Sequence, residues 1–234
     1  MPTATGATKN GKSQVKELSQ TIIRQLEDRG IDSEMAVKFG LGLIKGHGGS
    51  EKLALPFKVK NETLSWKVRS VASSNDGMFW IGQEDVRGKS FFNEDCLRDD
   101  SLKDYPLIIT EGEIDCLTIL PWYPKCVSVP NGANTKSIPI EDERSYSAFE
   151  YLNNAIDLLK SVKEIIIATD GDRAGRILLE DLALRLGKPR CRWVMYPFKK
   201  SDPSERCKDL NESFNEWGYN GIQNIIEKAK WYPI

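Results

Sequence analysis

The feature that most constrains this chain is an alternation of short apolar segments with helix-like segments in its second half. The apolar segments are "PLIITEG", "CVSVPNGA", "EIIIATDGD" and "CRWVMYP", and a stretch typical of a helix follows each of them. Short apolar strands of this kind are typical of sheets that are buried on both faces. Strands separated by helices predict a parallel, doubly wound sheet with right-handed crossovers.

The first half of the chain has a different pattern. An amphipathic helix is predicted to stop at Gly30, and a second helix to start from a cap at Asp32 or Ser33. "LALPFKVKNETLSWKVRSV" then alternates apolar and polar residues around a turn at Asn61, as a β-hairpin does. We therefore predict a small α+β subdomain ahead of an α/β domain. The predicted divisions are a flexible leader (1–14), the N-terminal subdomain (15–104), the α/β domain (105–215) and a C-terminal helix or tail (216–234).

Charge is unevenly distributed, although the formal net charge of the 234 residues is only −1. Residues 1–75 contain twelve Lys and Arg against seven Asp and Glu, which leaves a net −6 for the remainder. This asymmetry suits a protein that holds a phosphate polymer with its basic part and metal ions with its acidic part. From the totals alone, ordinary surface charge is the simpler interpretation.

The cysteines and the N-terminus bear on location. The five cysteines are scattered without a CxxC pair, and the single His47 does not complete a zinc site with them, so we expect no structural zinc. Scattered thiols and the lack of an apolar N-terminal segment favour a reducing, cytoplasmic location. A weak organelle-targeting role of the first residues stays open, and no membrane contact is expected.

Acidic residues cluster where the predicted strands end. Glu111 and Asp115 follow the first strand of the α/β domain, and Asp170 and Asp172 follow the third. Asp209 lies in "CKDLNE", after the fourth strand. Because function gathers outside the carboxyl ends of parallel strands, these acids predict an oxygen-rich site for a hard cation such as Mg²⁺.

Each acid also has a purely structural interpretation. Asp172 precedes "RAGRILLEDLA" and is placed to cap that helix, while Asp115 is placed for a solvated helix face. For any single acid the two interpretations have similar weight. Acidic groups at several equivalent strand ends are much harder to explain by capping alone.

These motifs resemble a known family. "TEGEIDCLTIL" followed by "ATDGDRAG" resembles the Toprim domain of bacterial primases, topoisomerases and some nucleases. Together with "WKVRSV", "FFNEDCL", "SVPNGA" and "KDLNE", it is similar to the primase half of phage primase-helicases and their Twinkle-type relatives. Three departures stand out: no cysteine pairs for a zinc ribbon, no helicase P-loop, and Asn211 where some primases carry a second Asp.

The resemblance implies a DNA primase core that synthesises short RNA primers on a single-stranded DNA template from ribonucleoside triphosphates. It implies Mg²⁺ or Mn²⁺, with two ions expected, and a replicative helicase in trans or in a longer parent chain. The implied catalytic residues are Glu111, Asp170, Asp172 and Lys67, and the implied metal ligands are Glu111, Asp170, Asp172, Asp209 and Asp115. The expected nucleotide- or template-binding residues are Lys67, Arg69, Arg87, Lys89, Asn131 and Lys208.

Two other functions remain open at this point. A Toprim nuclease would use the same acids with water as the nucleophile, and a non-catalytic module would bind DNA and load or regulate a helicase. The "KVR" and "KDLNE" segments favour polymerisation over cleavage. Topoisomerase activity is disfavoured because the chain is short for a strand-passage gate.

Overall fold

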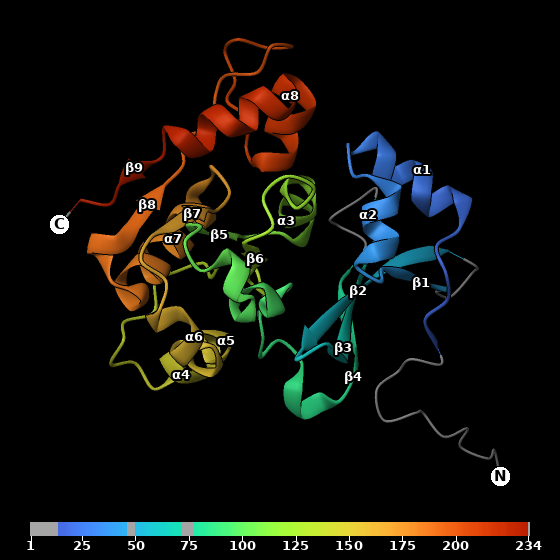
Figure 1. Cartoon of the computed structure of the whole chain (residues 1–234), viewed down its shortest axis with the longest axis horizontal. Coiled ribbons are helices and arrows are strands. Elements are labelled where there is room, and N and C mark those ends of the chain that lie inside the picture. Colours follow the sequence, from blue (N-terminus) through green and yellow to red (C-terminus); the bar gives the residue numbers. More distant parts are fainter. Residues whose placement is uncertain (1–13, 46–49, 72–76, 234) are drawn as a thin grey trace. The chain divides into compact units, whose positions relative to one another are not determined.

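The computed structural model describes residues 14–45, 50–71 and 77–233, and the predicted leader lies almost entirely outside them. The chain divides into two compact units, Met1–Arg87 and Gly88–Ile234 (Figure 1). Each unit has its own sheet, and the predicted combination of a small α+β part with an α/β part is confirmed. None of the helices in the described ranges is long and apolar enough to span a lipid bilayer.

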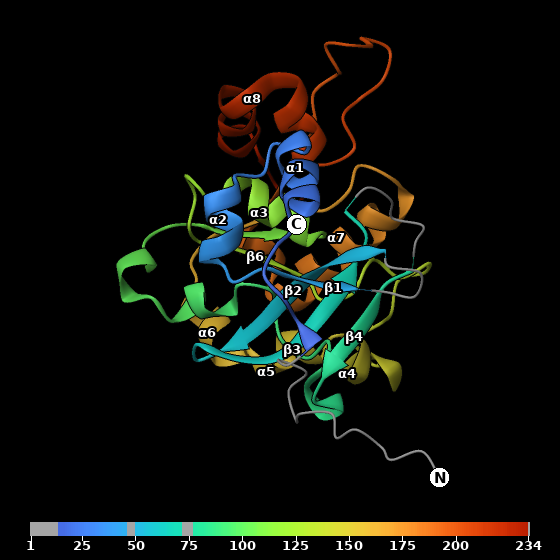
Figure 2. The ribbon, with the colours of Figure 1, turned by 90° about the vertical axis from the view of Figure 1, so that its right-hand side faces the viewer.

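The first unit combines two short helices with an antiparallel sheet. Ser19 caps α1 (Gln20–Asp28) by accepting from the Ile22 N–H at 3.2 Å, and Asp32 caps α2 (Ser33–Lys38). The sheet has the order β1-β2-β3-β4 (Figure 2). Its strands are β1 (Gly42–Lys45), β2 (Glu51–Val59), β3 (Glu62–Arg69) and β4 (Phe79–Gly82).

The two faces of β3 carry different residues, as its alternating sequence requires. Trp66 and Val68 are buried in a cluster with Ile44 and Ala54, so Trp66 is a core residue. The side chain of Lys67 therefore projects from the opposite face. The hairpin turn that precedes β3 forms at the predicted place, with left-handed backbone conformations at residues 60 and 61.

The second unit contains a five-stranded sheet with the order β6-β5-β7-β8-β9. Its strands are β5 (Leu107–Thr110), β6 (Cys126–Ser128), β7 (Ile165–Ala168), β8 (Cys191–Trp193) and β9 (Lys230–Trp231). The first four are parallel to their neighbours, as predicted, so their carboxyl ends meet at one edge. The short β9 adds an antiparallel edge strand, which the sequence pattern did not reveal.

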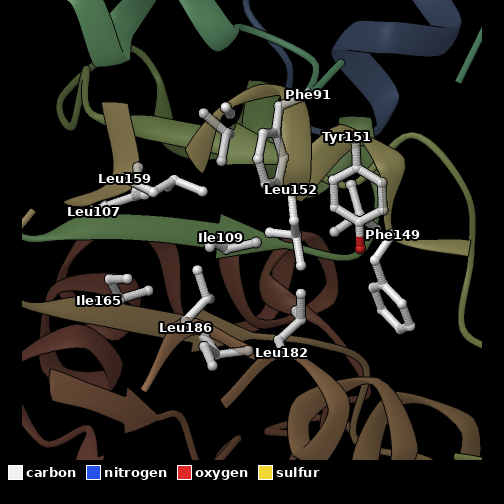
Figure 3. Packing of buried hydrophobic residues seen from close by; sticks show 14 of the residues in the cluster. Phe91, Leu107, Ile109, Phe149, Tyr151, Leu152, Leu159, Ile165, Leu182 and Leu186 are labelled. Atoms are coloured by element: carbon white, nitrogen blue, oxygen red, sulfur yellow. The ribbon is translucent and has the colours of Figure 1, made fainter. Parts of the chain in front are cut away.

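Helices cover both faces of this sheet. They are α3 (Glu113–Ile119), α4 (Arg144–Ala148), α5 (Glu150–Asn154), α6 (Ile156–Lys160), α7 (Arg173–Leu186) and α8 (Leu210–Glu227). Side chains of Ile109 and Ile165 on the strands pack with Leu152 of α5 and Leu182 of α7 in one core cluster (Figure 3). The alternate strand residues, among them Ile108, are buried too, and α3 and α8 pack against each other.

The compact units divide at a different point from the predicted boundary at 104/105. Residues 88–104 belong to the second unit. Phe91 is fully buried in the core of that unit, and the Phe92 backbone N–H donates to the Ser128 carbonyl at 3.0 Å. The sequence around these two aromatic residues is polar, so the pattern did not indicate that this segment belongs to the second core. The two buried aromatic rings nevertheless hold it there.

Candidate metal centre

The adjacent ends of β5 and β7 bring the first acidic groups together. Glu111 follows β5, and its carboxylate accepts hydrogen bonds from two backbone N–H groups, those of Ala133 and Asp170, each at 3.2 Å. Ala133 lies in the loop after β6, so one side chain ties together the loops that follow three neighbouring strands. Glu111 thereby organises the edge of the sheet at which the remaining acids are placed.

Three aspartates converge at this edge. Asp115, Asp170 and Asp209 each offer a carboxylate oxygen, and these oxygens all lie within 4.8 Å of one another. Asp115 comes from the first turn of α3, Asp170 from the loop after β7 and Asp209 from the start of α8. A cluster of carboxylate oxygens suits Mg²⁺ or Mn²⁺, so the donors that the chain presents fit the divalent ion implied by the sequence.

Hydrogen bonds hold two of these carboxylates in place. Asp115 Oδ1 accepts from the Asn211 backbone N–H at 2.9 Å, and Asp209 Oδ1 caps α8 by accepting from the Glu212 N–H at 2.6 Å. The side-chain amide of Asn211 donates to Thr118 Oγ1 at 2.9 Å. The side chain of Asn211, the residue at which this sequence departs from some primases, thus joins α8 to α3, while its backbone N–H holds Asp115.

Two glycines at this edge are needed because their neighbours leave no room for a Cβ atom. A Cβ on Gly112 would lie 2.7 Å from Asp115 Oδ2, although the φ of Gly112 is an ordinary −108°. A Cβ on Gly175 would lie 2.0 Å from the Asp170 carbonyl oxygen. Gly175 was not singled out from the sequence. Its signal was a second glycine shortly after "DGD", where α7 begins against the strand end.

The structure assigns Asp172 a capping position. Its side chain accepts from the Gly175 N–H at 2.8 Å at the N-terminus of α7, and the residue is exposed. Within the described ranges, the group that converges is Asp115, Asp170 and Asp209, and Asp172 lies outside it. The capping interpretation of Asp172 therefore holds, and its role as a metal ligand stays a prediction.

Burial and like charge raise the proton affinity of the site. Desolvation, followed by the negative charges of Glu111, Asp209 and Asp172, raises the pKa of Asp170 to about 7, with Lys208 opposing the shift. Burial also raises the pKa of Glu111, against the lowering effect of its two backbone hydrogen bonds. A carboxyl group whose pKa is raised by burial and by neighbouring carboxylates is typical of a functional site.

Three predicted basic residues lie in the first unit. Lys67 on β3 is largely buried, with Nζ 6.0 Å from the centre of the Trp80 ring. Arg69 Nε contacts the Ser70 carbonyl oxygen at 3.4 Å. Arg87 Nη2 donates to the Gly82 carbonyl at 2.6 Å, which gives its guanidinium a local structural contact. Their part in binding nucleotide or template stays a prediction.

Three further predicted binding residues lie in the second unit. Lys89 Nζ pairs with Glu150 at 3.1 Å, and Asn131 is exposed beside Gly88. Lys208 is adjacent to the acidic cluster, with Nζ 3.7 Å from Asp209 Oδ2 and its side chain 65% exposed. Of this group, Lys208 is thus placed beside the converging acids, where it is available to a phosphate.

Part of the chain matches a known family. Residues 108–213 match the Toprim-like family. The chain is 41% identical over 157 residues to the Twinkle homolog protein, chloroplastic/mitochondrial, of Arabidopsis thaliana, covering 62% of this chain and 22% of that protein. It is 36% identical over 187 residues to the Primase homolog protein of the same plant, covering 78% of this chain and 51% of that protein. The chain therefore spans between a fifth and a half of these curated relatives.

Solved structures show the same fold. The primase fragment of the bacteriophage T7 primase-helicase superposes with a TM-score of 0.65 at 21% identity, over 94% of this chain and 81% of that one. The zinc-binding and RNA polymerase domains of the Aquifex aeolicus primase give a TM-score of 0.64 at 18% identity, over 90% and 56%.

The fold and the acidic edge define the class of this protein: residues 108–213 form a Toprim domain. Within that class, the chain is homologous to Twinkle and primase homologs and resembles the primase half of primase-helicases. The resemblance expected from the sequence motifs is confirmed.

Proposed function

We propose that this chain is a DNA primase catalytic core, which synthesises short RNA primers on a single-stranded DNA template from ribonucleoside triphosphates. The observation that carries the proposal is the convergence of Asp115, Asp170 and Asp209 at the strand-end edge of a Toprim domain. Similarity to a plant primase homolog over 78% of the chain supports it. Nucleotidyl transfer requires chiefly positioning and neutralisation of phosphate charge, which suits a site made of carboxylates and cations.

The reaction is the attack of a 3′-hydroxyl on the α-phosphorus of a nucleoside triphosphate: one P–O bond forms and the bond to pyrophosphate breaks. Asp115, Asp170 and Asp209 would hold a divalent ion, which supplies charge neutralisation and activation of the hydroxyl when bound. We assign Glu111 as the base that accepts the proton of the hydroxyl, because burial raises its pKa above the usual range.

The remaining site residues serve the substrates in this proposal. Lys208 beside the acids would contact the phosphates. Lys67 and Arg69 on β3 would bind the nucleotide or the template backbone, since residues two apart on a strand share a face. Asp172, as a helix cap next to Asp170, would position the loop and contribute to a second ion site.

A partner and a location also belong to the proposal. Because one curated relative is a Twinkle homolog, we propose that a replicative helicase acts with this chain, in trans or in a longer parent protein. The name of that relative places it in the chloroplast or mitochondrion, which favours the organelle over the cytoplasm as the place of action. A fusion of the complete natural protein to a fluorescent reporter distinguishes the two locations.

The test of the proposal is incubation with single-stranded DNA templates of random sequence, labelled ribonucleoside triphosphates and Mg²⁺ or Mn²⁺. We expect ladders of short RNA that depend on both template and metal. Shortening of the template without RNA synthesis would instead indicate a nuclease. Retarded migration of the template with neither product would indicate a DNA-binding or helicase-loading module.

A further inference from the structure

A cavity of about 500 Å³ lies in the second unit, directly beside Asp170. The loop after β7 forms one wall of the cavity, and α7 together with the segment that follows β8 forms others. Its volume is within the range of small-molecule sites. The residues that characterise it are Asp170, Leu179, Trp193, Tyr196, Arg206 and Tyr232.

The interior of the cavity suits a flat, mostly apolar group. Leu179 of α7, Trp193 of β8 and Tyr232 at the end of the chain provide apolar and aromatic surface, and none of them is fully buried. The Tyr196 ring is buried and immobilised, because its hydroxyl donates to the Thr169 carbonyl at 2.9 Å. Aromatic walls of this kind stack on nucleobases, each of which has a π-face.

Charges of both signs line the wall, Arg176 and Arg206 together with Asp170 and Glu180. Arg176 Nη1 donates to the Gly171 carbonyl at 3.1 Å, and Arg206 Nη1 donates to the Tyr196 carbonyl at 2.7 Å. Among the described residues, neither guanidinium forms an ion pair with a carboxylate, so both retain donors for an anionic ligand. Glu180, an exposed acid on the same wall, offers an acceptor for an exocyclic amino group.

We propose that this cavity binds the base and ribose of a nucleotide, with the phosphates directed toward Arg176 and Arg206. Apolar surface for a base, two guanidinium groups for phosphate and a wall shared with Asp170 together select a nucleotide over a purely apolar ligand. The inference rests on the proposed function, because a nucleotidyl transferase needs a nucleotide beside its acidic edge. The cavity assignment goes further, because it specifies where the base of that nucleotide binds.

The test is isothermal titration of the full chain with ATP, and separately with inorganic tripolyphosphate, in the presence of Mg²⁺ and without template. Leu179→Trp fills the cavity with a larger side chain. Leu184→Trp is the matched control, because Leu184 lies on the same helix, is 46% exposed and does not line the cavity. Thermal melting of each variant establishes that it is folded.

We expect Leu179→Trp to weaken ATP binding by about tenfold, because the larger side chain occupies the space of the base, while tripolyphosphate binding stays unchanged. Arg176→Ala combined with Arg206→Ala should weaken both ligands. Leu184→Trp should behave as the wild type. ATP binding by folded Leu179→Trp at wild-type strength, or an equal loss for both ligands, would overturn the cavity assignment.

The two proposals fail in different ways. A wild-type chain that binds ATP, loses it with Leu179→Trp and makes no RNA would retain the cavity site and refute the primase proposal. A chain that makes RNA and binds ATP equally well with and without the filled cavity would retain the primase proposal and refute the cavity site.

Discussion

The two sheets of this protein place their charged residues in different ways. In the parallel sheet, the first turn of α3, the loop after β7 and the start of α8 bring Asp115, Asp170 and Asp209 to one edge. In the antiparallel sheet, Lys67 and Arg69 lie two residues apart on β3 and share a face. A parallel sheet thus gathers residues that are distant in sequence at its edge, whereas an antiparallel strand presents near neighbours along its face.

The difference has a consequence for how each site tolerates change. The acids at the edge are coupled through burial and mutual repulsion, so the loss of one alters the others. The cations on β3 would act through separate phosphate contacts, so their losses should be graded. Changes at the acidic edge should therefore have larger effects on activity than changes on β3.

The largest effect is expected from Asp170→Asn. It removes a charge at the centre of the acidic cluster, and we expect a loss of about 10²–10³-fold in RNA synthesis, with the fold retained. Primer-synthesis rates, with circular dichroism of the variant, measure this. Asp157→Asn, at an exposed position on α6, is the control. A folded Asp170→Asn protein with wild-type activity would remove the acidic edge from the mechanism.

The next effect is expected from Gly112→Ala. The new Cβ would lie 2.7 Å from Asp115 Oδ2, the end of a flexible side chain, so the carboxylate moves while the fold stays intact. We expect Mn²⁺ affinity to fall by about 10–100-fold, as for other changes to the support of metal ligands. Titration followed by electron paramagnetic resonance measures it.

The matched control is Gly132→Ala, since a Cβ at Gly132 would meet nothing within 4 Å and this glycine follows the neighbouring strand β6. Equal Mn²⁺ affinities for the two variants would show that Asp115 need not be held where the structure places it.

A smaller, graded effect is expected on β3. Lys67→Ala and Arg69→Ala should each weaken binding of single-stranded DNA or nucleotide by several-fold. Each should also reduce the slope of log affinity against log salt concentration by about one, because binding with one phosphate contact fewer releases fewer counterions. Lys45→Ala on β1 is the control, at an exposed position of the same sheet. Binding measured from 50 to 200 mM salt with unchanged slopes would reduce Lys67 and Arg69 to structural or surface residues.

The smallest effect concerns stability without metal. The pKa of Asp170 is raised to about 7 in the folded protein. The contribution of Asp170 to the stability of the fold is therefore fully present below its unfolded pKa, and it is lost as the pH rises through 7. Asp170→Asn should therefore raise the melting temperature of EDTA-treated protein by about 3 °C at pH 8 and by a smaller amount at pH 5, where only part of the contribution has been lost. The same increase at both pH values would contradict a raised pKa.

Much of the fold was evident from the sequence. The alternation of apolar strands and helices predicted the parallel sheet, and the hairpin around Asn61 was predicted from its alternating pattern. The segment 145–162 is helix-like in sequence but forms three short helices, α4 to α6, with non-helical backbone at Phe149 and Ala155. Both side chains are buried in the core, so packing overrode the helical propensity of the segment.

The sequence by itself determined which chemical groups arrive at the carboxyl edge of the sheet, because strand ends and their acids are local features of the pattern. Only the tertiary structure decided that Asp115 and Asp209 join Asp170 while Asp172 caps α7. That choice depends on contacts such as Asn211 to Asp115, between segments distant in the chain, and on close approaches that only Gly112 and Gly175 allow. The spacing of hydrophobic residues specifies whether a segment forms a helix or a strand. Which loops lie next to one another depends on the order of the strands in the sheet and on how the helices pack against it.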